Sequence, residues 1–281
     1  MKKNGLIKPL FLLVAAFSLI SMAKAQYYYK DLVSNKQLLA EMAQLKDQKI
    51  RSIIVTSFED DGSPSDGFFC EKNISKNYST VETMTNSNVT GASLFTSFFD
   101  KKGLLLKTID SSSIASSISE YGYNEKGLIT SIRSSVRSSD DDFANQIVEE
   151  HLYEYSGSGL PVKMIKVKNF TDSSTILFST DEKNNISIEK NTKTGETYYY
   201  YYDSKNLLTD VVHLNPFNQK MLPDYVFEYN PAGLITQMTT TEEGGSYYYI
   251  WKYTYDNGLR TSEKCFSKEK RLMGRIVYEY K

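Results

Sequence analysis

The side chains that most often carry catalysis are few in this chain, and they form no recognisable pattern. His151 and His213 are the only histidines, and they lie far apart in the sequence. No H-E-x-x-H, C-x-x-C or G-x-S-x-G motif is present. Each histidine is better explained as a structural residue than as a metal ligand or a base. The sequence therefore predicts no catalytic residue, no metal site and no cofactor.

Neighbouring acidic residues are present, but they do not identify a site. The pair Glu149 and Glu150 and the segments 60-DDGSPSDG-67 and 140-DDDFANQ-146 lie in a chain with 24% charged residues. Neither segment matches an EF-hand loop, so we interpret both as solvated loops. One alternative stays open, namely an envelope hydrolase whose carboxylate pair is assembled only by folding.

Aromatic residues are the best candidates for ligand binding. Tyr199, Tyr201, Tyr248 and Trp251 lie in the two densest aromatic segments, 198–202 and 246–255. On the non-core face of a sheet they could stack on sugar rings or hold an extended polymer. The alternative is a purely structural ladder with tyrosines on both faces.

The two cysteines, Cys70 and Cys265, lie near opposite ends of the chain. In an oxidising compartment they could form one disulfide that closes a very long loop. Sequence alone does not place their Cα atoms within bridging distance, so two buried thiols remain the alternative.

Residues 1–25 resemble an export signal. Lys2, Lys3 and Lys8 precede an apolar run from Leu10 to Ile20, and 23-AKA-25 is a small-x-small cleavage site. The run is too short to be a transmembrane helix, and no later segment is long enough. We predict cleavage before Gln26 and a periplasmic, cell-surface or secreted protein.

The charge of the predicted mature chain, residues 26–281, excludes some partners. Removal of four lysines from 33 Lys and Arg leaves 29, against 34 Asp and Glu, a net charge near −5. Nucleic-acid binding requires clustered cations, which are absent, so we expect no nucleic-acid partner.

A repeated motif determines the predicted fold. Its six clear copies are 97-SFFDKKGLLLKT-108, 121-YGYNEKGLITSI-132, 153-YEYSGSGLPVKM-164, 200-YYYDSKNLLTDV-211, 227-FEYNPAGLITQM-238 and 253-YTYDNGLRTSE-263. A weak copy lies at 178-FSTDEKNNISI-188, and a half copy, 278-YEY-280, ends the chain.

Each part of the motif suits a β-hairpin. An aromatic-x-aromatic pair places two rings on one face of a strand. Asp, Asn or Ser then favours a type I turn, and Gly or Asn follows where φ must be positive. The paired rings and the following Leu should be buried and the intervening residue exposed. Within 198-YYYYY-202, Tyr200 and Tyr202 are therefore core residues, and Tyr199 and Tyr201 face outward.

The pattern Y-x-Y-[DN]-x-x-G-L-[IL]-T resembles the tyrosine–aspartate (YD) repeat of Rhs-type proteins over residues 97–281. The resemblance implies a strip of antiparallel hairpins, which in large members closes into a hollow shell around a toxin domain. This chain has too few repeats to close such a shell and no recognisable toxin domain. We predict an all-β array of about 14 strands forming a twisted, curled sheet.

The N-terminal region, 26–96, should cap that sheet. Residues 35–47 have apolar residues at helical spacing after a candidate cap at Ser34. The helix would cover the first sheet edge, or alternatively bind a partner. Residues 50–57 and two segments within 78–99 should be strands.

The predicted function is a non-enzymatic binding or scaffolding protein of the cell envelope. Its ligand would be a polysaccharide or another envelope protein, and its oligomeric state is undetermined. A small outer-membrane β-barrel is the alternative, although the outward motif positions are Glu, Thr and Gly rather than apolar.

Overall fold

Eighteen antiparallel β-strands form one continuous sheet in the computed structural model, which describes residues 26–138, 146–214, 219–242 and 247–281. The predicted signal peptide and most of the 140–146 loop lie outside these residues. The strands are β1 (Ser52–Phe58), β2 (Phe69–Ile74), β3 (Thr80–Asn86), β4 (Ser93–Phe99), β5 (Leu105–Ser112), β6 (Ala115–Tyr123), β7 (Ile129–Ser138), β8 (Ile147–Tyr155), β9 (Pro161–Lys168), β10 (Asp172–Thr180), β11 (Ile186–Asn191), β12 (Thr197–Tyr202), β13 (Leu208–Leu214), β14 (Met221–Tyr229), β15 (Ile235–Thr241), β16 (Tyr248–Asp256), β17 (Leu259–Ser267) and β18 (Leu272–Tyr280).

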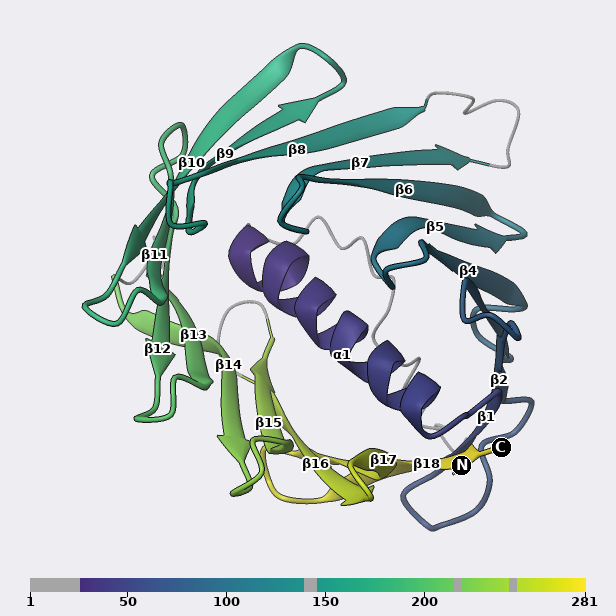
Figure 1. Cartoon of the computed structure of the whole chain (residues 1–281). Helices are drawn as coiled ribbons and strands as arrows, with labels where there is room; N and C mark the ends of the chain where they lie inside the picture. Colours follow the sequence, from purple (N-terminus) through teal and green to yellow (C-terminus); the bar gives the residue numbers. More distant parts are fainter. Residues whose placement is uncertain (1–25, 139–145, 215–218, 243–246) are drawn as a thin grey trace, which may run out of the picture.

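The sheet closes into a barrel because its first and last strands pair. β1 and β18 are antiparallel neighbours from Ile53 opposite Tyr280 to Phe58 opposite Arg275. The terminal Lys281 extends this pairing, since its carbonyl accepts from the Ser52 nitrogen at 2.9 Å. The all-β prediction is confirmed. The curled sheet that we predict closes completely, and it has 18 strands rather than about 14. Pairing the two ends removes both sheet edges, which would otherwise be exposed (Figure 1).

The repeated motif forms the tight turns, as the sequence predicts. At Asp203, one side-chain oxygen accepts hydrogen bonds from the backbone nitrogens of Lys205 and Leu207, at 2.8 and 2.9 Å. The same two bonds recur at Asp100, Asn124, Asp181 and Asn230. Asn206 has a φ of +61°, in the turn position that other copies fill with Gly. The preference for Asp or Asn therefore reflects an acceptor that satisfies two turn amides at once.

A β-bulge accompanies the aromatic pair in each clear copy, at its second aromatic residue, and changes which residues are buried. In the fourth copy the register shifts between Tyr201 and Tyr202, and equivalent shifts occur in the others. The motif leucine Leu207 is only half-buried, whereas the next residue, Leu208, is buried. Our prediction that the motif leucines share the buried face with the rings is therefore wrong, except at Leu259. The extra residue of each bulge shifts the alternation by one.

The second aromatic of the motif ties neighbouring strands together. The Tyr229 hydroxyl donates to the Leu208 carbonyl oxygen on the preceding strand, at 2.6 Å. Five other tyrosines make the equivalent bond at 2.6–2.8 Å: Tyr123, Tyr155, Tyr202, Tyr255 and Tyr280. These bonds explain why tyrosine rather than phenylalanine occupies this position in most copies.

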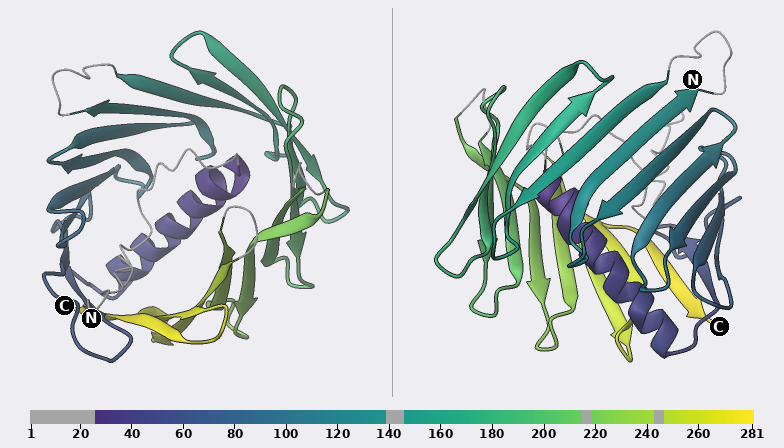
Figure 2. Two further views of the ribbon diagram at one scale, coloured as in Figure 1. Left: turned by 180° about the vertical axis from the view of Figure 1, so that it is seen from behind. Right: turned by 45° about the horizontal axis from the view of Figure 1, so that its top comes forward.

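The N-terminal segment lies inside the barrel. A π-helical turn, η1 (Tyr28–Val33), continues directly into helix α1 (Ser34–Asp47), and both cross the interior diagonally (Figures 1 and 2). The predicted helix is confirmed, but its predicted place at a sheet edge is wrong, because the closed ring has no edge. No helix of the described residues is long and apolar enough to span a membrane.

The width of the ring explains why a helix is needed there. Eighteen strands about 4.8 Å apart give a circumference of roughly 86 Å, hence about 27 Å across before strand tilt is added. Side chains alone fill barrels of about 8 strands but not of 16 to 18. A helix of about 10–12 Å diameter occupies much of the remaining space.

Two hydrophobic clusters fix the two ends of residues 26–47, which we call the inner segment. Tyr28 and Tyr29 pack against a cluster centred on buried Tyr200 and Phe227 of β12 and β14. Met42 and other residues at the far end of α1 pack with β1, β2, β4, β5, β17 and β18. Gln44 and Gln48 both donate to the Asn257 carbonyl oxygen, at 3.1 and 3.0 Å.

Removing the Tyr229 hydroxyl tests the bond between strands. Tyr229→Phe should lower the free energy of unfolding by about 0.5–1.5 kcal/mol, because the Leu208 carbonyl loses its side-chain donor. Tyr199→Phe is the matched control, since the Tyr199 hydroxyl donates to no other described residue. Urea denaturation of both variants measures the difference. Equal losses in the two variants would contradict the role assigned to Tyr229.

Candidate functional site

The candidate ligand-binding aromatics do not form one surface. Tyr199 and Tyr201 face outward on β12, and Tyr201 is 49% exposed, while Tyr198 and Tyr200 between them are buried. Tyr248 also faces outward, on β16, where the Lys268 amine lies 6.0 Å from its ring centre. Three strands, β13, β14 and β15, separate β12 from β16. The two aromatic segments therefore lie on strands that are not neighbours.

Trp251 points into the barrel. It lies opposite Met238 on β15 and opposite Cys265 on β17, and Cys265 is only 1% exposed. Trp251 is also two residues from buried Tyr253, which has the same strand parity. Trp251 therefore does not share an outer surface with Tyr199, Tyr201 and Tyr248.

The two cysteines are free thiols in the structure. Both face inward, but Cys70 is on β2 and Cys265 is on β17, with β1 and β18 between them. Three strand spacings of about 4.8 Å separate their strands, roughly 14 Å. A disulfide requires Cα atoms within about 7 Å. The alternative of two buried thiols therefore holds.

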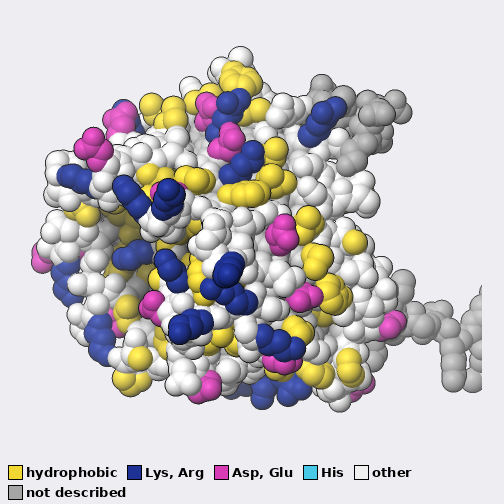
Figure 3. All heavy atoms as spheres, turned by 45° about the vertical axis from the view of Figure 1, so that its right-hand side comes forward, with side chains coloured by type: hydrophobic (Ala, Val, Ile, Leu, Met, Phe, Trp, Pro, Cys, Tyr) yellow, Lys and Arg dark blue, Asp and Glu magenta, His cyan; other side chains and the backbone are white. Residues whose placement is uncertain are grey.

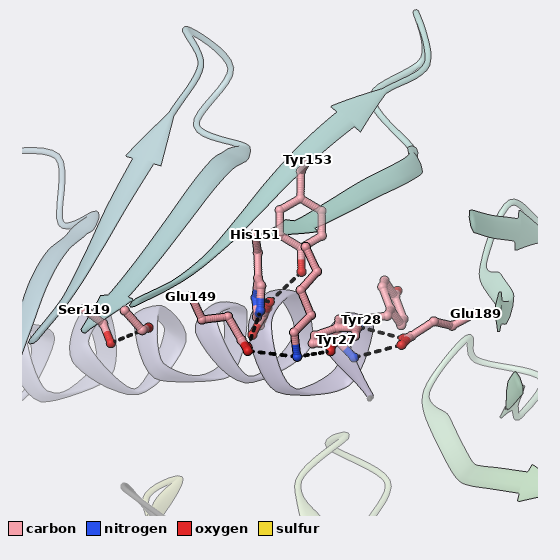
Figure 4. Close-up of polar contacts among 10 residues, drawn as sticks. Tyr27, Tyr28, Ser119, Glu149, His151, Tyr153 and Glu189 are labelled. Atoms are coloured by element: carbon pink, nitrogen blue, oxygen red, sulfur yellow. Dashed lines mark hydrogen bonds and ion pairs between the residues drawn. The ribbon is translucent and has the colours of Figure 1, made fainter. Parts of the chain in front are cut away.

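The polar cluster of the lumen joins the inner segment to β8 and β9 (Figure 4). The Asp31 carboxylate lies 2.6 Å from His151 Nδ1 and accepts from the Tyr153 hydroxyl at 2.6 Å. His151 Nε2 lies 2.9 Å from the Glu149 carboxylate. The Lys166 amine lies 2.9 Å from the same carboxylate.

Lys166 extends the cluster to the start of the inner segment. Its amine donates to the Tyr27 hydroxyl at 2.8 Å, and the Tyr27 ring meets the His151 ring edge-on at 4.8 Å. This series of contacts begins at Asp31 and ends at Tyr27, both in the inner segment. The side chains between them belong to strands β8 and β9 of the barrel wall. We call Asp31, Glu149, His151 and Lys166 the lumen ion cluster.

The electrostatics of the lumen ion cluster favour charged side chains. Burial alone would lower the pKa of His151, but Asp31 and Glu149 outweigh it and raise that pKa to about 9. Burial alone would raise the pKa of Glu149, but the His151 and Lys166 hydrogen bonds and charges lower it to about 2. At neutral pH, His151 is thus an imidazolium between two carboxylates.

A second buried carboxylate, Glu189, holds the first residues of the inner segment. Its two oxygens accept the backbone N–H groups of Tyr27 and Tyr28, at 3.0 and 2.9 Å. The Tyr200 hydroxyl donates to it at 2.7 Å. Glu189 is 1% exposed, and its burial raises its pKa to about 7 although all three hydrogen bonds favour the charged form.

A third polar cluster lies near the other end of the helix. The Arg260 guanidinium contacts the Glu263 carboxylate at 2.7 Å, and the Tyr278 hydroxyl donates to that carboxylate at 2.5 Å. Arg260 also lies over the Tyr253 ring, 4.3 Å from its centre. This group joins β16, β17 and β18 rather than forming an open site.

The geometry leaves the lumen ion cluster with little catalytic capacity. Both ring nitrogens of His151 contact carboxylates, so the ring has no free lone pair to act as a base. The neighbouring hydroxyl of Tyr153 donates to Asp31. Among the residues that the structure describes, no three His, Cys, Asp or Glu side chains are placed to hold a metal ion. The arrangement is suited to anchoring the inner segment.

Part of this cluster could have been found in the sequence. Glu149 and His151 have the same parity in the strand as the motif aromatics Tyr153 and Tyr155, which alternation places on the inward face. Asp31 and Glu189 gave no such signal, since their partners lie far away in the sequence. His213 is structural too: its Nδ1 lies 2.8 Å from the Asp224 carboxylate.

No family model matches the chain, and no curated protein matches it. A porin-like protein from Bacteroides uniformis is similar at 9% sequence identity, covering 83% of this chain and 98% of that chain with a TM-score of 0.39. A porin-like protein from Bacteroides vulgatus is similar at 12% identity, covering 83% and 98%, with a TM-score of 0.30. The TcdB2–TccC3 complex is similar at 12% identity and a TM-score of 0.30, covering 84% of this chain but 17% of that chain. Likenesses this weak say nothing about what this chain does.

The raised pKa of His151 predicts a pH dependence of stability. The folded chain keeps the His151 proton up to about pH 9, whereas an unfolded chain releases it near pH 6.5. The folded state therefore binds more protons in this interval, and its free energy of unfolding should fall as pH rises through it, by roughly 3 kcal/mol in total. Denaturant titrations from pH 6 to 9.5 on the wild type and His151→Gln measure this. Parallel curves would show that His151 does not contribute.

Proposed function

We propose that this chain is an exported, water-facing β-barrel of the cell envelope that works by binding rather than by catalysis. The observation that carries the proposal is a row of charged side chains across the outer face. Each member of the row is the cross-strand partner of the next, from β5 to β8: Lys107, Glu120, Arg133 and Glu150. The Lys107–Glu120 and Arg133–Glu150 ion pairs measure 3.6 and 3.4 Å.

These ion pairs lie within the strands rather than at the rims. A further pair, Glu154 with Lys163, connects β8 and β9 at 2.6 Å. On the side of the barrel shown in Figure 3, charged side chains are interspersed with hydrophobic ones. A Lys or Arg facing the middle of a bilayer costs about 2–4 kcal/mol, so such rows suit contact with water.

The inner segment occupies the lumen, so we expect a ligand to bind the outer face of the barrel. Tyr199 has Ile188 and Val212 as its cross-strand neighbours, and Tyr201 has Asp210. This surface combines exposed rings with a carboxylate that can accept hydrogen bonds from hydroxyl groups, which suits a polysaccharide. Another envelope protein is the next ligand class. A relationship to YD-repeat proteins is part of the proposal. It is supported by the repeated motif and by the turn hydrogen bonds that recur among its copies in this chain.

A second candidate is an outer-membrane β-barrel, the alternative named in the sequence analysis, and the closure of the ring favours it. An even number of antiparallel strands, with tight turns at one end and longer connections at the other, is the architecture of such proteins. The charged rows distinguish the two candidates, because they must face either water or lipid.

Partitioning into lipid distinguishes a water-facing barrel from an outer-membrane barrel. Purified 26–281 should remain monodisperse without detergent and should stay in the supernatant when phosphatidylethanolamine–phosphatidylglycerol vesicles are sedimented, because its outer ion pairs favour water. Glu120→Leu with Arg133→Leu, which makes the outer row apolar, is the matched comparison and should lower solubility. Insertion of the wild type into the vesicles would support the outer-membrane alternative.

Substitution of an outward tyrosine tests the ligand surface. If a polysaccharide binds, Tyr201→Ala should weaken binding roughly 5- to 150-fold, as expected when about 1–3 kcal/mol of stacking is lost. Trp251→Phe is the control, because Trp251 faces the lumen and its loss should leave affinity unchanged. Glycan-array binding followed by calorimetry gives both values. Equal affinity in the wild type and Tyr201→Ala would exclude this surface.

A further inference from the structure

The start of the inner segment has an electrostatic imbalance. Glu189 is 1% exposed, and no Lys, Arg or His side chain of the described residues forms a salt bridge with it. Lys30 interacts with Glu189 only through space, without direct contact. A buried carboxylate without a directly bound cation is costly, even when it accepts several hydrogen bonds. The nearest backbone nitrogens, those of Tyr27 and Tyr28, contribute only neutral donors.

The missing charge has a source in the chain itself. The predicted cleavage site precedes Gln26, whose nitrogen is three covalent bonds from the Tyr27 nitrogen that Glu189 already binds. Hydrolysis of the Ala25–Gln26 peptide bond consumes one water. It leaves a carboxylate on Ala25 and an α-amino group on Gln26, which with a pKa near 7.7–8.0 is mostly protonated at pH 7.

We propose that the processed amino end of the chain binds inside its own barrel, with the α-ammonium of Gln26 paired to Glu189. The acceptor capacity is available: Glu189 Oε2 accepts from both Tyr28 and Tyr200, whereas Oε1 accepts from Tyr27 alone. A leader still joined to Gln26 would present one neutral amide N–H in place of this charge.

A second, independent observation points to the same group. Gln26 is 6% exposed, and its side-chain oxygen, Oε1, is buried with no hydrogen-bond partner among the described residues. Buried acceptors in native proteins are nearly always satisfied. An ammonium carries three N–H donors where a peptide nitrogen carries one, so it can serve both Glu189 and this oxygen. Processing would thereby complete the hydrogen bonding at the top of the inner segment.

The first experiment identifies the amino end and its environment. Mass spectrometry of the exported protein should show Gln26 as the first residue with an intact amine. That amine should react with an acylating reagent much more slowly in the folded chain than in guanidinium. A first residue other than Gln26, or equal reaction rates in the two states, would overturn the proposal.

The second experiment isolates the pair. Chain 26–281 is prepared with a free amine and, by glutaminyl cyclase treatment before refolding, with a pyroglutamyl end that lacks the charge. The blocked form should melt about 4–8 °C lower, as expected for loss of one charge-assisted hydrogen bond in a chain of this size.

The free and blocked forms of the chain are then prepared with Glu189→Gln, which completes a double-mutant cycle. There the melting difference between free and blocked ends should disappear. In Glu228→Gln, which alters an outward carboxylate, the difference should persist. An equal melting temperature of the two wild-type forms, or an undiminished difference in Glu189→Gln, would contradict the pairing. If Glu189→Gln does not fold, the acylation rates of the folded and unfolded wild type still test whether the amino end is bound.

Discussion

The constraint on which this structure depends is the empty centre of an 18-stranded ring. Closure gives each described strand a paired neighbour on both sides, including β1 and β18, but it encloses a space wider than two layers of side chains. The chain fills the space with its own residues 26–47. Tyrosine serves this arrangement well, because its ring reaches toward the centre and its hydroxyl can return to a neighbouring strand, as Tyr229 does.

The buried charges follow from the same constraint. A helix placed in the lumen brings unpaired backbone N–H groups at its start, and these must be satisfied away from bulk water. Glu189 accepts two of them. Carboxylates inside the barrel then require cations, and His151 and Lys166 supply them around Glu149. We therefore interpret the shifted pKa values of Glu149, His151 and Glu189 as products of filling the lumen.

Local features of the fold were predictable from sequence, whereas long-range ones were not. The turns at Asp203 and Asn230 were identified because the side chain, the backbone and the following Gly or Asn act within five residues. The helix followed from its apolar spacing. Closure was missed because the β1–β18 register depends on residues from opposite ends of the chain. The short strand β2 was missed because 69-FCEKNI-74 has few apolar residues.

The candidate site shows the same division. Parity along 198-YYYYY-202 placed Tyr201 outward, and the structure agrees. Parity would also have placed Trp251 inward, two residues before Tyr253, had the motif been extended back along its strand. Asp31 could not be assigned a role, since nothing local indicates that it meets His151.

The seam between β1 and β18 gives the barrel a definite order of assembly. All other strand pairs join segments consecutive in the chain, so each can form as soon as its second strand is available. In a chain that crosses a membrane amino end first, β1 emerges early and must wait for the last residues. During that wait its free edge is open to pairing with other chains. Availability of β18, rather than the folding of any single hairpin, is therefore the event that closes the barrel.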